Sequence, residues 1–276
     1  MSSAVPATRT SRDRADLPVR MREVGATPSA ALYLTEPLRG VIDATFGPVM
    51  ARPLLGRAPD GDGHGVLVLP GLLASDRSTR TLRTFLKRKG YRMRGWRLGR
   101  NLGPTSTVMA GMPLALEALA EETGGPVSVI GWSLGGIYAR HLAREHPDHV
   151  RQVITLGSPF GVADGHRTHA DRTFERLSFL HSRGPGVPKR RQVGGPVPVP
   201  STSLYSRFDG VVAWRACLAE PTALHQNVEV RCSHLGFGFD PVSLWTVADR
   251  LARPVEDWTP FRPPIVLRPF FGALDK

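Results

Sequence analysis

The sequence predicts an α/β fold, with a mainly parallel sheet of about six strands and helices on both of its faces. Short apolar runs rich in β-branched residues alternate with longer segments in which apolar residues recur every three or four positions. Such alternation is typical of parallel strands joined by crossover helices. The chain has 276 residues, of which 41% are hydrophobic and 22% are charged, so it can bury a sizeable core and is not disordered as a whole. No apolar run approaches the roughly 20 residues that a membrane-spanning helix needs.

The N-terminal part is expected to lie outside the sheet. Residues 1–28 lack apolar periodicity and are predicted to form a disordered tail, and residues 29–276 are predicted to form one domain. Residues 29–55 carry apolar residues at mixed helical spacing, interrupted by three prolines, which predicts one or two short helices packed on the main body. The N-terminus has no apolar segment of the kind found in secretory signals, which favours a cytoplasmic protein.

The sheet begins after the turn at Asp60-Gly61-Asp62-Gly63. Strands are predicted where short apolar runs occur, at residues 66–70, 91–98, 127–130, 150–156, 203–206 and 228–231. Helices are predicted where apolar residues keep helical spacing, at residues 76–89, 105–122 and 134–145 and from Asp240-Pro241 onward. Asp at the N-cap followed by Pro at the first helical position is a strong start signal for the last of these helices.

Two further segments break this alternation. Residues 160–200 are rich in glycine and proline, contain one helical piece near 172–180 and are too long for an ordinary loop, so they are expected to form an insert beside the sheet. The insert includes the basic run Lys189-Arg190-Arg191. Residues 253–276 form a proline-rich C-terminal extension, whose aromatic residues either pack along the body or anchor the protein at an interface. These residues are Trp258, Phe261, Phe270 and Phe271.

Ser133 is the candidate nucleophile. It lies in Gly131-Trp132-Ser133-Leu134-Gly135-Gly136, between a predicted strand and a predicted helix. A serine held on such a tight turn projects its hydroxyl above the carboxyl edge of the sheet, and side chains in place of the glycines would collide with the neighbouring strand and helix. The alternative is a glycine-rich turn with an idle serine.

A serine needs a base and an orienting carboxylate. Of the nine histidines, His234 is the candidate base, because it follows the last predicted strand and so reaches the same sheet edge as Ser133. Asp209 is the candidate acid, at the end of the preceding strand; Asp164 and Asp240 are weaker rivals, the latter because it caps a helix. The alternatives are a structural histidine and an ordinary Asp-Gly turn. The order Ser, Asp, His fits this sheet topology.

Two backbone amides complete the candidate site. The amide of Leu134 lies at the start of the helix that follows Ser133, and the amide of Leu72 lies in the loop after the first strand, in Pro70-Gly71-Leu72-Leu73. Both are expected to point at an oxyanion that develops on a substrate carbonyl.

These motifs resemble those of the α/β-hydrolase superfamily, in particular its bacterial lipase-like and esterase-like members. The resemblance covers roughly residues 60–255 and rests on VLVLPG, GWSLGG, ITLGSPF, YSRFDGVVAW and CSHLGF. It implies the α/β-hydrolase fold, Ser133 as nucleophile, Asp209 as acid, His234 as base, and Leu72 and Leu134 as oxyanion donors. The stretch GWRLGRNLGP (95–104) is similar to a subfamily signature and either lines the pocket or turns the chain.

The sequence departs from the family pattern in two ways. The two antiparallel strands that usually precede the first parallel strand are not evident, and Trp132 stands where many relatives have histidine. The insert at residues 160–200 occupies the place of the family's cap, which would exclude water and select the substrate. The alternative for this insert is a disordered surface loop.

The formal net charge of +12 is weak evidence for a nucleic acid partner, because only four of the 36 basic residues are lysine and an arginine-rich codon usage explains much of the excess. Ten basic residues and no acid lie between Arg77 and Arg100. Of these, Arg77, Arg80, Arg83 and Lys87 share a helix face that is either solvated or in peripheral contact with an anionic membrane surface. Cys217 and Cys232 do not form a disulfide framework, although a single bridge between them is conceivable. No metal or cofactor motif is present, and the oligomeric state is left open.

Three functions fit these features. The first is hydrolysis of a carboxylic ester, from a small-molecule or lipid-like substrate, through an acyl-enzyme on Ser133. The second is an acyltransferase that uses the same three residues but passes the acyl group to an alcohol. The third is a non-catalytic module that binds anionic surfaces, which the intact Ser–Asp–His set disfavours.

Overall fold

Six parallel strands form the centre of the protein. The computed structural model describes residues 27–50, 52–161, 168–182, 187 and 193–272. The strands are β1 (Gly65–Leu69), β2 (Arg92–Gly95), β3 (Val127–Trp132), β4 (Val150–Leu156), β5 (Ser201–Ser206) and β6 (His225–Val230). They pair in the order β2-β1-β3-β4-β5-β6, and every neighbouring pair is parallel. This arrangement confirms the predicted α/β class.

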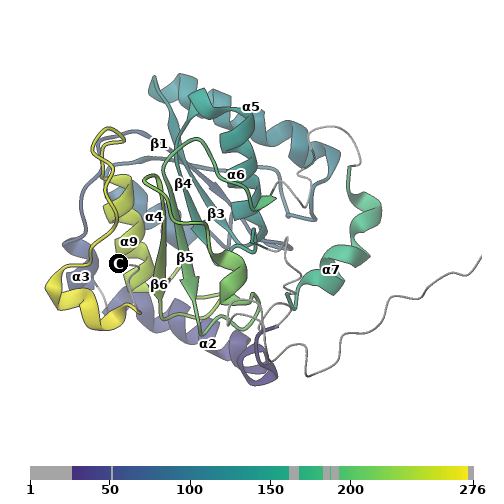
Figure 1. Ribbon diagram of the computed structural model, residues 1–276, viewed down its shortest axis with the longest axis horizontal. Coiled ribbons are helices and arrows are strands. Elements are labelled where there is room, and N and C mark those ends of the chain that lie inside the picture. Colours follow the sequence, from purple (N-terminus) through teal and green to yellow (C-terminus); the bar gives the residue numbers. More distant parts are fainter. Residues whose placement is uncertain (1–26, 51, 162–167, 183–186, 188–192, 273–276) are drawn as a thin grey trace, which may run out of the picture.

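Helices cover both faces of the sheet (Figure 1). One face packs on α5 (Ser106–Thr123) and α6 (Leu134–Glu145), and the other on α4 (Arg80–Arg88) and α9 (Pro241–Leu251). Alternate residues of β1 enter the two cores, Leu67 and Leu69 on the α5 side and Val66 and Val68 on the α9 side. Because both faces are covered, β1 (GVLVL) is an unbroken apolar run in the sequence.

Helix boundaries follow the expected capping signals in two cases. The Thr105 side chain accepts a hydrogen bond from the Val108 amide at the start of α5, and Gly124 ends that helix in the left-handed conformation. Asp240 caps α9 through the Ser243 amide, with Pro241 at the first position. α4 begins four residues later than predicted, because the Asp76 carboxylate accepts hydrogen bonds from the Trp96 and Arg97 amides at the end of β2.

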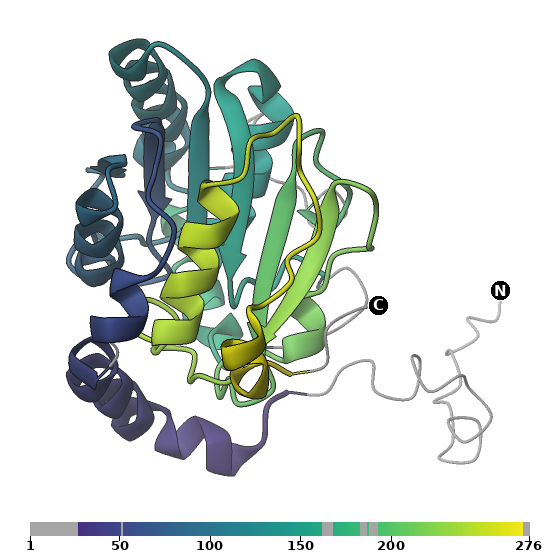
Figure 2. The same cartoon turned by 90° about the vertical axis from the view of Figure 1, so that its left-hand side faces the viewer.

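Residues before the sheet form α2 (Ala30–Met50) and α3 (Arg52–Gly56). The prediction of short helices was wrong for α2, which runs for 21 residues through Pro37 and Pro48. Pro37 is exposed, so water can bond the carbonyl that its missing N–H leaves free. α2 lies across the carboxyl edge of the sheet (Figure 2), and no antiparallel strand joins the sheet among the described residues.

The polar and apolar sides of α2 are reversed relative to those of most surface helices. Its side toward the protein carries polar residues, among them the buried Glu36. Its outward side exposes large apolar residues, namely Tyr33, Leu34, Leu38, Val41 and Ile42. The helix is therefore held by hydrogen bonds to the body, as described below, more than by apolar burial.

The insert and the C-terminal extension also contain ordered elements. The insert forms α7 (Asp171–Arg176) and a short 3₁₀ helix, Ser178–Leu180, while its basic run at residues 189–191 and Asp164 lie outside the described residues. In the extension, Phe261, Leu267 and Phe271 are buried in the same core as α9, which favours packing along the body. Among the helices that the structure describes, none is long and apolar enough to cross a bilayer.

Candidate active site

Ser133 occupies a strained turn between β3 and α6. Its φ and ψ angles are 53° and −121°, a region that non-glycine residues rarely adopt. A Cβ on Gly135 would lie 2.2 Å from the Leu69 carbonyl oxygen, and one on Gly131 would lie 2.3 Å from the Gly135 carbonyl oxygen. The structure therefore confirms that glycines are required for this turn on steric grounds.

Asp209 and His234 form a buried pair. The His234 Nδ1 lies 2.7 Å from the Asp209 Oδ2, and both side chains are almost fully buried. The other carboxylate oxygen, Oδ1, accepts hydrogen bonds of 2.8 and 2.7 Å from the amides of Val211 and Val212. These bonds fix the carboxylate, and the carboxylate in turn fixes the orientation of the imidazole ring.

The charge state of His234 depends on its neighbours. Burial alone lowers the pKa of His234, but the Asp209 carboxylate and, more weakly, the Glu36 carboxylate outweigh it, so that the pKa of His234 is raised above its ordinary value. The two carboxylates thus stabilise the imidazolium that forms once a neutral His234 has taken a proton from a serine.

The turn of Ser133 and the Asp209–His234 pair meet at one place on the sheet edge. Trp132 Nε1 donates a hydrogen bond of 3.1 Å to the His234 carbonyl oxygen. The Ser133 amide donates to the Leu156 carbonyl oxygen at the end of β4, and a Cβ on the next residue, Gly157, would lie 3.0 Å from Asp209 Oδ2 and 3.1 Å from His234 Nδ1. Trp132 therefore links the two parts of the site.

The loop after β1 lies beside Ser133. A Cβ on Gly71 would lie 3.2 Å from the Ser133 Cβ, so this glycine allows the loop that carries Leu72 to approach. As the first residue of α6, Leu134 has an amide without an acceptor inside its own helix. β1 and β3 are also neighbours in the sheet. The strand that follows β1 in sequence, β2, lies on one side of this pair, and the strand that follows β3, β4, lies on the other side. Ligands of α/β proteins bind at such a switch point.

The stretch at residues 95–104 supports this loop. The buried Asn101 side chain donates a hydrogen bond of 2.8 Å to the Pro70 carbonyl oxygen and accepts one from the Gly103 amide. Its backbone also bonds to Leu73 and Ala74. Of the two interpretations of this stretch, its contacts favour a turn that braces the loop carrying Leu72.

Glu36 is a site residue that the sequence did not reveal. It lies on α2, and its Oε1 accepts a hydrogen bond of 2.8 Å from the Leu235 amide, next to His234. Its Oε2 accepts one of 3.0 Å from the Gly210 amide, next to Asp209. About two turns further along α2, the Asp43 carboxylate accepts hydrogen bonds from the Ser233 hydroxyl and amide. α2 thus fastens the loops that carry both candidate residues.

The rival residues have other roles where they are described. Asp240 caps α9. A second Ser–His–Asp arrangement lies at the opposite, amino edge of the sheet, where His64 contacts Asp62 and its Nε2 lies 2.8 Å from the Ser128 hydroxyl. Ser128 is completely buried in β3, so no substrate can reach it. Cys217 and Cys232 are buried free thiols, which excludes the bridge between them in this structure.

Comparisons with known proteins agree with the fold. Lipase B of Aspergillus fumigatus superposes with a TM-score of 0.51 and 16% sequence identity, over 70% of this chain and 53% of the lipase. This similarity shows the α/β-hydrolase fold and no more. The pimeloyl-(acyl-carrier protein) methyl ester esterase of Neisseria meningitidis serogroup C is 43% identical over 44 residues, and that of Chromobacterium violaceum is 42% identical over 55 residues. These matches cover 17% and 22% of the two esterases, and 16% and 20% of this chain. No protein-family model matches the chain.

Proposed function

We propose that this protein hydrolyses carboxylic esters through an acyl-enzyme on Ser133. The observation that carries the proposal is the buried Asp209–His234 pair, 2.7 Å apart, at the sheet edge where Ser133 stands on its strained turn. The fold supports it, and so do the names of the proteins compared above, a lipase and methyl ester esterases. The substrate class is therefore a small-molecule or lipid-like ester.

The geometry supports the following steps. His234 takes the proton of the Ser133 hydroxyl as the serine oxygen attacks the ester carbonyl carbon, and the Asp209 carboxylate stabilises the imidazolium that forms. The amides of Leu72 and Leu134 stabilise the negative charge on the carbonyl oxygen. His234 then protonates the leaving alcohol. In the second half, His234 activates water, which attacks the acyl-enzyme and releases the carboxylic acid and Ser133.

The proposal is tested with a p-nitrophenyl ester and a fluorophosphonate probe. Wild-type protein is expected to turn over the ester and to carry the probe on Ser133, whereas Ser133→Ala loses both and keeps its far-ultraviolet circular dichroism. Undiminished turnover by Ser133→Ala would contradict the assignment. The acyltransferase alternative is separated by adding alcohols of increasing chain length: a hydrolase releases mainly the free acid, and an acyltransferase forms mainly the new ester.

The insert at residues 160–200 is assigned as the cap of this site, within a single domain that begins near residue 29. The described part of the insert contacts the stretch at residues 95–104, which supports the loop carrying Leu72. His181 Nε2 lies 3.0 Å from the Leu102 carbonyl oxygen, and the Ser182 amide donates a hydrogen bond to the Pro104 carbonyl oxygen. A segment in this position can exclude water and select the acyl chain.

The protein is further assigned to the cytoplasm, in line with its two buried free thiols. A peripheral contact with anionic membranes is assigned to the exposed basic side chains of Arg77, Arg80 and Lys87. Sedimentation with anionic vesicles should then weaken steadily as salt rises, since such contacts are screened over about 8–10 Å at 0.1–0.15 M salt. Vesicle binding that salt does not affect would contradict this contact.

A further inference from the structure

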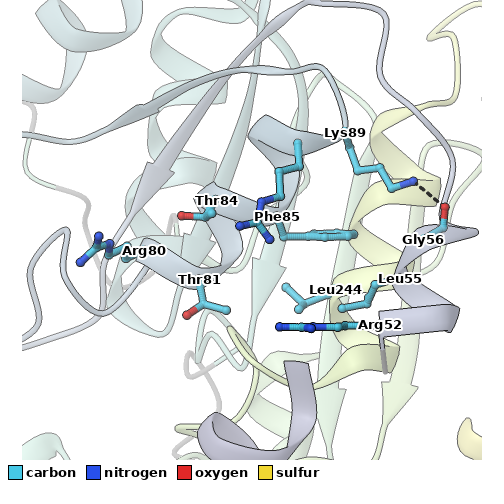
Figure 3. Close-up of a pocket in the computed structure, with 10 residues that line it drawn as sticks. Arg52, Leu55, Gly56, Arg80, Thr81, Thr84, Phe85, Lys89 and Leu244 are labelled. Carbon is cyan, nitrogen blue, oxygen red and sulfur yellow. Dashed lines mark hydrogen bonds between the residues drawn. The ribbon is translucent and has the colours of Figure 1, made fainter. Parts of the chain in front are cut away.

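A cavity of about 530 Å³ opens between α3 and α4, away from the candidate active site (Figure 3). Its apolar surface consists of Leu55 on α3, Phe85 on α4 and the buried Leu244 on α9. Thr81 and Thr84 add two hydroxyl groups from α4. The volume falls in the range of small-molecule sites, which is roughly 300–1,000 Å³.

The charges around this cavity all have the same sign. Its lining includes four basic residues and no acidic one; the basic residues are Arg52, Arg80, Arg88 and Lys89. Lys89 is already used, because its ammonium group donates to the carbonyl oxygens of Gly56 and Ala58 and pairs with Asp60 at 3.1 Å. The side chains of the three arginines form no hydrogen bond or ion pair with any residue that the structure describes.

Three unpaired guanidinium groups around one cavity repel one another, and a bound anion would remove that repulsion. Guanidinium groups bind phosphate oxygens in pairs through their parallel N–H groups, and the two threonine hydroxyls can donate further hydrogen bonds. Arg52 lies directly beside Leu55 and Leu244 in Figure 3. An anion held by Arg52 is therefore next to apolar surface that can accept a hydrocarbon group.

We propose that this cavity binds the phosphate group of an amphiphilic phosphate ester, whose apolar part lies on Leu55, Phe85 and Leu244. None of the residues that line it belongs to the loops of Ser133, Asp209 or His234. Binding is thus separate from ester hydrolysis, and Ser133→Ala retains it. The ligand is either a soluble phosphate ester or the head group of a membrane phospholipid, and the two share this recognition chemistry.

The test uses calorimetric titration of the full chain with inorganic phosphate and with decyl phosphate below its aggregation concentration. Decyl phosphate is expected to bind at least about tenfold more tightly than inorganic phosphate, because the apolar surface adds to the contact with the phosphate. Arg52→Gln and Arg88→Gln should each weaken decyl phosphate binding roughly tenfold, the effect of losing one charge-assisted hydrogen bond. Arg57→Gln is the matched control: Arg57 is an exposed arginine directly after α3 and does not line the cavity.

Vesicles of phosphatidylglycerol and of phosphatidylcholine distinguish the sources of the ligand. Binding of monomeric decyl phosphate alone identifies a soluble ester. Additional binding to phosphatidylglycerol vesicles that is weakened by Arg88→Gln but not by Arg57→Gln identifies a membrane lipid. The proposal is overturned if decyl phosphate does not bind, if inorganic phosphate binds equally tightly, or if Arg57→Gln weakens binding as much as Arg88→Gln. All three substituted residues are exposed, so circular dichroism and the Tm should stay unchanged.

Discussion

Glu36 illustrates how a single buried carboxylate can act on a site from outside it. It is only 3% exposed and bonds to the amides next to both Asp209 and His234. It touches no reacting atom in the proposed mechanism and is therefore a positioning residue. Its negative charge also contributes to the raised pKa of His234, after the larger effect of Asp209.

Glu36→Gln should reveal both effects. The amide side chain keeps one acceptor oxygen but loses the other, so kcat should fall, about tenfold for a small misplacement of His234. Removal of the negative charge lowers the pKa of His234, and His234 must be neutral to act as a base, so activity should persist to lower pH than in the wild type. The pH dependence of kcat/KM measures this.

Asp43→Asn is the matched control for that experiment. Asp43 lies on the same helix and holds Ser233, but it does not contribute to the pKa of His234. Its loss should lower kcat while the acid limb of the profile stays in place. Equal displacement of the acid limb in both variants would mean that Glu36 acts only through the structure of the loop.

Asp209→Asn tests the choice of the acid. Without the carboxylate, His234 loses both its orientation and the charge that stabilises its protonated form, so kcat should fall by roughly 10⁴-fold. Asp240→Asn should leave kcat and stability nearly unchanged, because asparagine caps helices about as well as aspartate. The opposite pattern, with Asp240→Asn inactive and Asp209→Asn active, would show that the acid was chosen wrongly.

Residues that follow strands could be predicted from the sequence, and Glu36 could not. Ser133, Asp209 and His234 each follow an apolar run, and the carboxyl ends of parallel strands share one edge. Glu36 is one polar residue among several in a helical segment. Its role depends on contacts with residues 174 and 199 positions further along the chain, and no local pattern records such a contact.

At the scale of the elements, the loop after β1 depends on the stretch at residues 95–104. Asn101→Ala removes the hydrogen bond to the Pro70 carbonyl oxygen and leaves that oxygen buried without a partner. The Leu72 amide should then lose its fixed position, and kcat should fall roughly 10- to 100-fold, with a smaller change in KM. Arg100→Ala is the control, as an exposed neighbour; a similar loss of kcat there would rule out a specific role of Asn101.

The elements themselves were predictable to different degrees. α6 begins and ends at the predicted residues, because apolar spacing and the Ser133 turn define it. The three prolines of residues 29–55 predict shorter pieces than α2, but Pro37 lies on the exposed side of this helix, where its cost is smaller. α4 was predicted to start too early, because the hydrogen bonds from Trp96 and Arg97 to Asp76 come from another strand.

At the scale of the whole molecule, the C-terminal extension completes the core around α9. The Phe261 ring packs at a tilted angle against the rings of Trp245 and Phe271, and the Phe261 amide donates a hydrogen bond to the Gln226 side chain. Phe261→Ala should lower the free energy of unfolding by about 3–5 kcal/mol, as for other large-to-small changes in cores. Phe270→Ala, at a position that is 54% exposed, should cost only about 0.5 kcal/mol. Urea denaturation of both variants measures the difference, and equal values would show that the extension does not belong to the core.

The way α2 is held also determines the order in which the chain can fold. α2 precedes all six strands in the chain, yet its hydrogen bonds through Glu36 go to Gly210 and Leu235, which are synthesised 174 and 199 residues later. Until then Glu36 lacks these two partners, and the outward side of α2 remains apolar. α2 therefore cannot complete its docking before the loops after β5 and β6 have formed, and the candidate site at the carboxyl edge is completed only when residues far apart in the chain come together.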